Sequence, residues 1–200
     1  MVAQRRVPLV AVYVVFFVSG FAALLYQTTW QRALFTLFGT NIESVTVVVT
    51  AFMAGLGLGS LVGGKLSDSE TRPLLPIFAA IELATALYGA FSLDLFAWAG
   101  AGVAGSTGQT AVVSFSLVLL PTLLMGSTLP LLAAHLVRAY GDVGRSVGVL
   151  YAVNTFGAAA GALVSATVLL RHLGLSGTTL LAVALNGLVG VVVLAMWWRR

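Results

Sequence analysis

The chain has 200 residues, of which 60% are hydrophobic and 8% carry a charge. Soluble domains carry roughly 25% charged residues, so this chain has too few polar side chains to cover a water-facing surface. The composition excludes a water-soluble globule and predicts that the lipid bilayer is the main solvent. The absence of cysteine excludes disulfides and thiolate metal sites. The net charge of +4 is carried by basic residues scattered between apolar runs. This pattern is typical of residues that set the orientation of a chain in the membrane, and it does not favour nucleic-acid binding.

Six apolar segments are each long enough to cross roughly 30 Å of hydrocarbon, which takes about 20 helical residues. They cover residues 7–30, 45–64, 74–96, 111–137, 147–170 and 173–198. The connections between them are short, and Arg171 with His172 is predicted to form a tight turn before the last segment. The sequence therefore predicts an all-α membrane protein with one transmembrane domain over residues 1–200.

Lysine and arginine in short loops are retained on the cytoplasmic side of a membrane. With six spans, one face of the membrane collects most of the basic residues, and the other face has Arg32 and Arg171. The first group is Arg5, Arg6, Lys65, Arg72, Arg138, Arg145, Arg199 and Arg200. This asymmetry predicts a bacterial inner-membrane protein with both termini in the cytoplasm. A cleaved signal peptide is the alternative for the N-terminus, but its apolar core would be too long.

Glycines recur four residues apart within the second and fifth segments, at Gly55, Gly59 and Gly63 and at Gly157 and Gly161. Small residues at this spacing let another helix approach at close backbone distance. We expect these glycines to provide close helix packing and to place both segments deep in the bundle. The alternative is that the smooth glycine faces also slide against a neighbouring helix during a conformational change. These segments are the middle members of two three-helix groups, which favours a 3+3 repeat.

Glu82 is the one acidic residue well inside a predicted span. Ionisable side chains in membrane helices are costly and mark functional sites by default. We expect Glu82 to face the bundle interior, where it would bind a cation, carry a proton or pair with a base such as Arg32. A satisfied structural hydrogen bond is the alternative.

Further polar residues lie at the end of the first segment and in the fifth and sixth. The first group, at amphipathic spacing, is Tyr26, Gln27, Trp30, Gln31 and Arg32. These residues predict the lining of a substrate pathway, with an interfacial belt as the alternative. Asn154 is expected to contact substrate or a neighbouring helix, and Asn186 to form a structural hydrogen bond.

Two prolines, Pro121 and Pro130, lie inside the fourth segment. Proline removes a backbone donor, so we expect either a gating element or a packing kink. The freed carbonyls would be satisfied by nearby hydroxyls, those of Thr122, Ser127 or Thr128. The two histidines have no partner at metal-ligand spacing, so neither a metal nor a cofactor is expected.

The charged loop after the second segment contains Gly64, Leu66, Asp68 and Arg72, with Pro73 suited to the first turn of the next helix. These residues resemble the cytoplasmic loop between the second and third helices of the major facilitator superfamily. The residues at 69–71 depart from the family pattern, which has basic residues and glycine there. The resemblance implies half of a major-facilitator-like bundle.

Four segments taken together are similar to the membrane domain of bacterial fused spermidine synthase-like or major-facilitator-like proteins. They are residues 19–27 with 30–32, 51–64, 120–130 and 150–158. In fused members of that family an aminopropyltransferase-like domain follows the last span. This chain has no room for a nucleotide-binding sheet, so we expect no enzyme activity from it alone.

The resemblance implies a stand-alone, half-size transporter that works as a homodimer in the lipid bilayer. Its expected cargo is a small polar or cationic solute, polyamine-like, and no nucleic acid is expected as a partner. The alternative is a non-transporting membrane module that anchors or regulates a cytoplasmic aminopropyltransferase-like enzyme.

Overall fold

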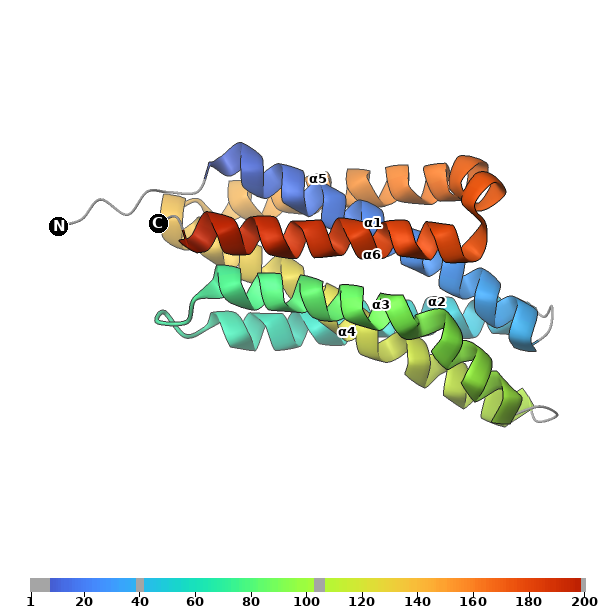
Figure 1. Ribbon diagram of the computed structural model, residues 1–200. Helices are drawn as coiled ribbons and strands as arrows, with labels where there is room; N and C mark the ends of the chain where they lie inside the picture. The colour runs from blue at the N-terminus through green and yellow to red at the C-terminus, as the bar shows by residue number, and fades with distance from the viewer. Residues whose placement is uncertain (1–7, 39–41, 103–106, 199–200) are drawn as a thin grey trace.

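The computed structural model describes residues 8–38, 42–102 and 107–198, which are helical with short connections and contain no strand (Figure 1). The helices are α1 (Leu9–Phe38), α2 (Ile42–Ser67), α3 (Leu74–Gly102), α4 (Thr107–Tyr140), α5 (Val143–Val164) and α6 (Leu170–Trp198). A π-helical turn, η1 (Ser165–Leu169), joins α5 to α6. The all-helical prediction is therefore confirmed for the described residues.

Five helical stretches are long and apolar enough to cross a membrane, judged by length and composition. They are Leu9–Phe35, Val45–Ser67, Leu74–Gly102, Gly108–Tyr140 and Val143–Trp198. The fifth has 56 residues, and a straight helix of that size would be about 84 Å long, far more than the roughly 30 Å of hydrocarbon.

The fifth stretch reverses direction at Gly174 (Figure 1). Gly174 has φ +65°, a conformation that residues with a Cβ rarely adopt. The tight turn predicted at Arg171 and His172 is wrong in position, because both residues are helical within α6. The helices also extend past several predicted ends, with α1 reaching Phe38 and α3 reaching Gly102.

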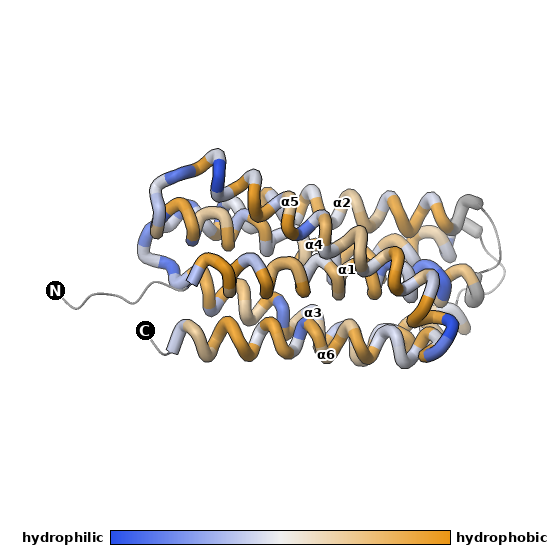
Figure 2. Tube along the Cα trace, turned by 90° about the horizontal axis from the view of Figure 1, so that it is seen from above, coloured by the Kyte–Doolittle hydropathy of each residue, from blue (hydrophilic) through white to orange (hydrophobic). Residues whose placement is uncertain are grey.

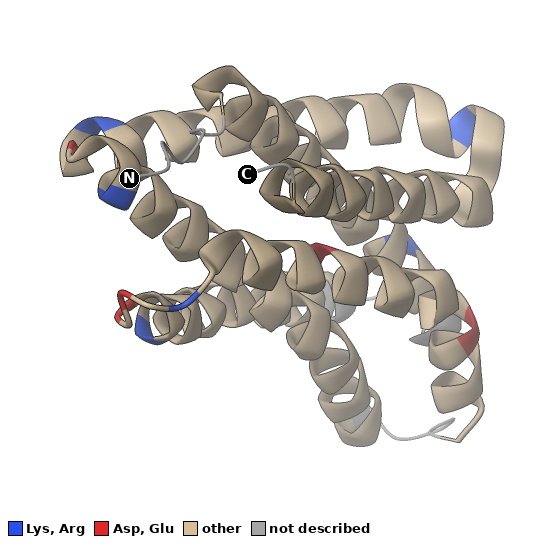
Figure 3. Cartoon of the chain, turned by 60° about the vertical axis from the view of Figure 1, so that its left-hand side comes forward, with Lys and Arg blue, Asp and Glu red and all other residues tan. Residues whose placement is uncertain are grey.

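The helix ends gather at two ends of the bundle (Figure 1). One end, termed the basic end, holds the start of α1, the end of α6 and the α2–α3 and α4–α5 connections. It carries Lys65, Arg72, Arg138 and Arg145, which lie in or beside these two connections, whereas Arg32 and Arg171 lie toward the opposite end, termed the far end. Figure 3 shows lysine and arginine residues at both ends. Figure 2 shows that hydrophilic segments concentrate at these two ends. The four basic residues at 5–6 and 199–200 lie outside the described residues.

The glycine face of α2 lies directly against α4. A Cβ built at any of three glycines would overlap α4: Gly55 against the side chain of Thr122, Gly59 against the carbonyl of Leu123 and Gly63 against that of Ser127. Only hydrogen at the glycine α-carbon allows the two backbones to come this close.

The glycine face of α5 meets α1 in the same way. Cβ atoms at Gly157 and Gly161 would overlap the carbonyls of Phe17 and Phe21. The expectation that α2 and α5 lie deep in the bundle is wrong, because each packs mainly on one helix and leaves apolar residues exposed. A smooth glycine face needs one close neighbour, not burial on all sides.

Two apolar clusters fill the interior at successive depths. The basic-end cluster comprises Val12, Val15, Phe16, Leu75, Phe78, Ala79, Leu132, Ala133, Leu136, Leu150, Val189 and Val193. The far-end cluster comprises Ala22, Leu25, Tyr26, Trp30, Ala33, Leu34, Val48, Ala51, Phe52, Phe96, Val118 and Ala182. Helices α1, α3, α4 and α6 contribute to both clusters, and α1, α3 and α6 all pack on one another.

Helix α4 continues through Pro121 and Pro130. Pro121 leaves the carbonyl of Leu117 without its helical donor, and the hydroxyl of Tyr88 in α3 donates to that carbonyl at 2.6 Å. The hydroxyls expected to take this role donate instead to carbonyls three or four residues before them; they are those of Thr122, Ser127 and Thr128. A cross-helix hydroxyl thus compensates for the proline.

Candidate functional site

Glu82 lies in α3 with only 1% of its surface exposed. Its Oε1 accepts a hydrogen bond from the hydroxyl of Ser19 in α1 at 2.6 Å. Its Oε2 is buried and has no hydrogen-bond partner among the described residues. Arg32 is 13 residues beyond Ser19 on α1, which is about 20 Å along the helix. Glu82 therefore does not pair with Arg32, and one of its carboxyl oxygens has no partner among the described residues.

Tyr26 and Trp30 are fully buried between α1 and α3. The Trp30 indole Nε1 donates to the hydroxyl of Ser92 at 2.9 Å. Its ring stacks on Tyr26 with centroids 4.8 Å apart and meets the edge of Tyr88 at 5.7 Å. The alternative of an interfacial belt does not hold for these two residues, because neither side chain reaches the surface.

Tyr26 packs on Gly89 of α3, where a Cβ would overlap the phenol ring. Its hydroxyl has no hydrogen-bond partner within the described part of the chain. Gly89 is seven residues beyond Glu82, and Tyr26 is seven beyond Ser19. Helices α1 and α3 start at the same end of the bundle and run in the same direction (Figure 1). The Ser19–Glu82 and Tyr26–Gly89 contacts therefore have the same alignment of α1 against α3.

Helix α6 adds three more buried polar side chains. Thr178 is hydrogen-bonded to the carbonyl of Gly174, and the other two are Asn186 (2% exposed) and Thr179 (3% exposed). Over residues 8–38, 42–102 and 107–198, four fully buried side-chain polar atoms lack a hydrogen-bond partner: Tyr26 OH, Glu82 Oε2, Thr179 Oγ1 and Asn186 Oδ1. All four are oxygens on α1, α3 and α6, which pack on one another. The structural hydrogen bond expected for Asn186 is therefore missing at its carbonyl oxygen.

Buried polar residues of all three helices lie between the members of the two apolar clusters. Three of them, Ser19, Glu82 and Asn186, are termed the polar layer, and Thr85 and Ser92 follow Glu82 on α3. On α1, for example, Phe16 before Ser19 belongs to the basic-end cluster and Ala22 after it belongs to the far-end cluster. The polar layer is thus enclosed by apolar side chains on both sides, where an unsatisfied oxygen is costly.

Asn154 of α5 is half-buried at the level of the polar layer. It packs against Gly20, which follows Ser19 on α1; a Cβ at Gly20 would lie 2.6 Å from the Asn154 Oδ1. Gln27 and Gln31 are half-buried and Arg32 is exposed. The structure therefore brings together Glu82 and Ser19, and it places Asn154 on another side of α1.

The loop residues predicted from the major-facilitator pattern lie at the basic end. Asp68 and Arg72 are exposed, and a Cβ at Gly64 would meet nothing within 4 Å. Arg72 Nη1 donates to the carbonyl of Leu66 at 3.3 Å. These residues shape the loop and do not contribute to the polar layer.

Arg138, at the end of α4, holds the same loop. Its Nη2 donates to the carbonyls of Ser67 at 2.5 Å and Ser69 at 3.0 Å. Its Nη1 donates to those of Arg72 at 3.3 Å and Glu70 at 3.4 Å. The guanidinium thus satisfies the last carbonyl of α2, which has no helical donor. Sequence reasoning used Arg138 only as a topology signal.

We expect Arg138→Gln to loosen this loop, because an amide cannot reach several carbonyls at once. Trypsin should then cleave after Lys65 several-fold faster than in the wild type, measured in detergent by mass spectrometry. Arg145→Gln, which changes another exposed arginine at the basic end, is the control and should cleave at the wild-type rate. Equal rates for Arg138→Gln and the wild type would show that the four hydrogen bonds do not order the loop.

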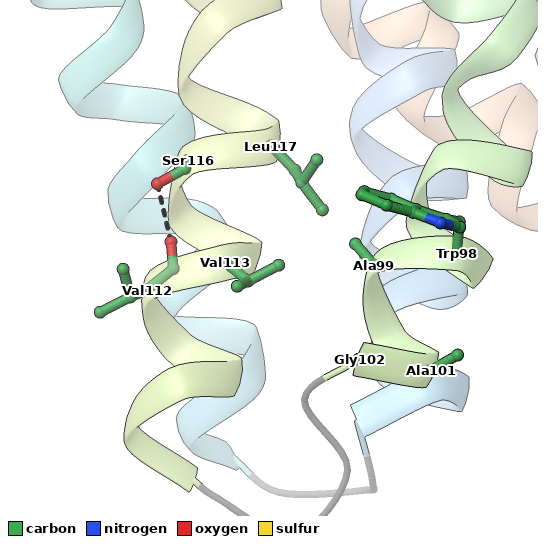
Figure 4. Close-up of a pocket in the computed structure, with 8 residues that line it drawn as sticks. All are labelled: Trp98, Ala99, Ala101, Gly102, Val112, Val113, Ser116 and Leu117. Atoms are coloured by element: carbon green, nitrogen blue, oxygen red, sulfur yellow. Dashed lines mark hydrogen bonds between the residues drawn. The ribbon is translucent and has the colours of Figure 1, made fainter.

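An apolar groove of about 670 Å³ lies between the end of α3 and the start of α4 (Figure 4). It is lined by Trp98, Ala99, Ala101, Gly102, Val112, Val113, Ser116 and Leu117. The hydroxyl of Ser116 donates to the carbonyl of Val112 at 2.8 Å, so the groove offers almost no free polar group. It does not include the polar layer.

Comparison with known proteins relates most of this chain to part of two polyamine aminopropyltransferases. Polyamine aminopropyltransferase 2 of Streptomyces coelicolor is 31% identical over 191 residues, which are 92% of this chain and 33% of that protein. Polyamine aminopropyltransferase 1 of the same organism is 28% identical over 189 residues, with the same coverage. No family model matches the sequence, and no solved structure matches it. The chain spans about a third of the length of the curated relatives it matches.

Proposed function

We propose that this chain is a membrane protein of polyamine metabolism that carries a small cationic, polyamine-like solute, with Glu82 as the cation or proton site. The observation that carries this proposal is the buried Glu82 carboxyl with one unpartnered oxygen. An unpaired polar group in an apolar interior costs several kcal/mol, so a retained free oxygen favours a ligand that donates to it. The names of the relatives supply the class of solute.

We propose six membrane crossings, with the basic end in the cytoplasm of a bacterial inner membrane. The reversal at Gly174 supports separate crossings by α5 and α6. Four described basic residues at one end against two at the other support the orientation.

A 3+3 repeat is part of this proposal, and repeated helix contacts support it. Gly20 of α1 packs on the carbonyl of Asn154 in α5, and Gly126 of α4 packs on that of Leu56 in α2. Further contacts repeat with the same residue offsets: Phe17–Gly157 corresponds to Leu123–Gly59, and Phe21–Gly161 corresponds to Ser127–Gly63. The α1–α5 pair is therefore packed as the α4–α2 pair is, which is the relation that repeats of three helices would produce.

We propose that two copies form the working transporter. Alternating access moves two bundles around a site near the midplane, and this chain supplies one bundle. A two-fold dimer would enclose a pathway lined by α1, α2, α4 and α5. Gln27, Gln31, Arg32 and Asn154, which do not contact Glu82, remain candidates for that lining.

The second candidate function is a non-transporting module that anchors or regulates an aminopropyltransferase-like enzyme. The match to a third of two polyamine aminopropyltransferases favours it. It predicts that the chain retains such an enzyme on membranes and changes its rate.

Uptake into proteoliposomes tests the transport proposal. Labelled polyamines and amino acids are offered to vesicles containing the wild type, the Glu82→Gln variant or no protein. Loss of a charge-assisted hydrogen bond of about 1.5–3 kcal/mol should reduce polyamine uptake by Glu82→Gln about ten- to a hundredfold. Absence of uptake of any solute by a monomeric wild type would contradict the proposal.

A further inference from the structure

The four unpartnered buried oxygens share a chemistry. Tyr26 OH, Glu82 Oε2, Thr179 Oγ1 and Asn186 Oδ1 can all accept hydrogen bonds. No described nitrogen is among the fully buried side-chain atoms without a partner. Glu82 Oε2, when ionised, and Asn186 Oδ1 only accept, whereas the two hydroxyls can also donate. A ligand that donates to all four oxygens is rich in donors, as a protonated amine is.

The alignment of α6 against α3 gives the order of these oxygens along the bundle axis. Helix α6 ends at the end where α3 begins (Figure 1), and Gly190 of α6 lies against Ala79 and Leu83 of α3. Counting back along α6 from Gly190 places Asn186 about one helical turn beyond Glu82, toward the far end.

The remaining two oxygens lie further toward the far end. Thr179 is seven residues before Asn186, and Tyr26 is seven residues after Ser19, the partner of Glu82. Seven residues correspond to about 10 Å of helix. The four oxygens thus form a row along one line, termed the α1/α3/α6 seam, in the order Glu82, Asn186, Tyr26 and Thr179. The midpoint between the first two lies about 10 Å from the midpoint between the last two.

The seam is polar on one side of Glu82 only. Toward the basic end its neighbours are the apolar side chains of Phe16, Phe78, Val189 and Val193. Toward the far end it holds the hydroxyls of Tyr26 and Thr179 and the stacked ring of Trp30. The further polar partners for a cation at Glu82 that the described residues offer on this seam therefore lie toward the far end.

We propose that the α1/α3/α6 seam binds a linear amine with two or more protonated nitrogens, one ammonium at Glu82 and Asn186 and another at Tyr26 and Thr179. This inference rests on the proposed function. The methylenes between the nitrogens lie along Ala22 and Ala182, which are fully buried between the two pairs of oxygens. The outer ammonium also gains from the aromatic faces of Tyr26 and Trp30.

Binding by the purified full chain tests the seam, with calorimetry of butylamine, putrescine and spermidine in detergent. The second subsite should make spermidine bind about tenfold or more tightly than butylamine, because the second contact is intramolecular. Thr179→Val and Tyr26→Phe should remove most of this advantage. Thr178→Val is the matched control, because Thr178 is adjacent and buried but its hydroxyl already donates to the carbonyl of Gly174 at 2.7 Å.

Thr179→Ser, which keeps the hydroxyl, should retain the wild-type preference, and unchanged thermal midpoints show that the variants fold. If Thr179→Val and Tyr26→Phe keep the full preference for spermidine, the seam is overturned and its oxygens are satisfied by water. That result leaves the proposed function standing if Glu82→Gln still loses uptake. If Glu82→Gln keeps both uptake and amine binding, the proposed function and the seam both fail.

Discussion

Trp30→Ala is expected to destabilise the fold by about 2–3 kcal/mol, whereas Trp98→Ala should change it by less than about 0.5 kcal/mol. Trp30 is 0% exposed and Trp98 is 76% exposed. In soluble proteins a buried Trp→Ala change costs roughly 3–5 kcal/mol. Part of that cost is transfer from water, which is small here because lipid tails are as apolar as the core. The cavity left by the indole is not relieved by lipid.

The Trp30 variant also leaves the Ser92 hydroxyl without the indole donor and removes the ring that stacks on Tyr26. The measurement is the unfolding midpoint of each variant in mixed micelles titrated with SDS. Equal midpoints for the two tryptophan variants would mean that the far-end cluster is not packed around α1 as described.

Gly59→Leu is the second large effect, because the new side chain has no place to go. A Cβ at Gly59 overlaps the carbonyl of Leu123 and approaches the α-carbon of Gly126 at 3.1 Å. The overlapped atoms of α4 are backbone atoms, which cannot rotate away from the new side chain as a flexible side chain could. Helix α2 must therefore separate from α4. Overpacking of this kind costs about 1–3 kcal/mol or more.

Gly57→Leu is the matched control on the same helix, because a Cβ at Gly57 meets nothing within 4 Å. Leucine also has a higher helix propensity than glycine by somewhat less than about 1 kcal/mol. The control should therefore be neutral or slightly stabilising in the same SDS titration. A Gly59→Leu variant as stable as the control would contradict the close α2–α4 contact.

The sequence predicts the helices well and their ends poorly. Apolar runs of sufficient length account for the helices, because hydropathy is a local property. The bend at Gly174 is not predictable from the sequence in the same way, since it is one of 22 glycines. The charged pair at Arg171 and His172 suggested a turn, but charged residues near a membrane surface remain helical without cost. Backbone conformation, not charge, decides where the chain reverses.

For the site, sequence reasoning predicted that Glu82 faces the interior, because it is flanked by apolar residues. It did not identify Ser19 as the partner or Thr179 as part of the seam. Thr179 and Asn186 are seven residues apart, a spacing that places them on one helix face. That signal was available, but which face meets Glu82 depends on the register between α1, α3 and α6. Such a register follows from packing between distant segments and not from local pattern.

The central claim is that Glu82 binds the cationic solute, and the comparison of Glu82→Gln with Asp94→Asn in polyamine uptake tests it most directly. Both changes replace a carboxylate in α3 by its amide, but Asp94 is exposed. If Glu82 binds the solute, Glu82→Gln should lower the initial rate about ten- to a hundredfold. Asp94→Asn should stay within about twofold of the wild type. Equal rates for the two variants, at equal amounts of folded protein, would contradict this claim.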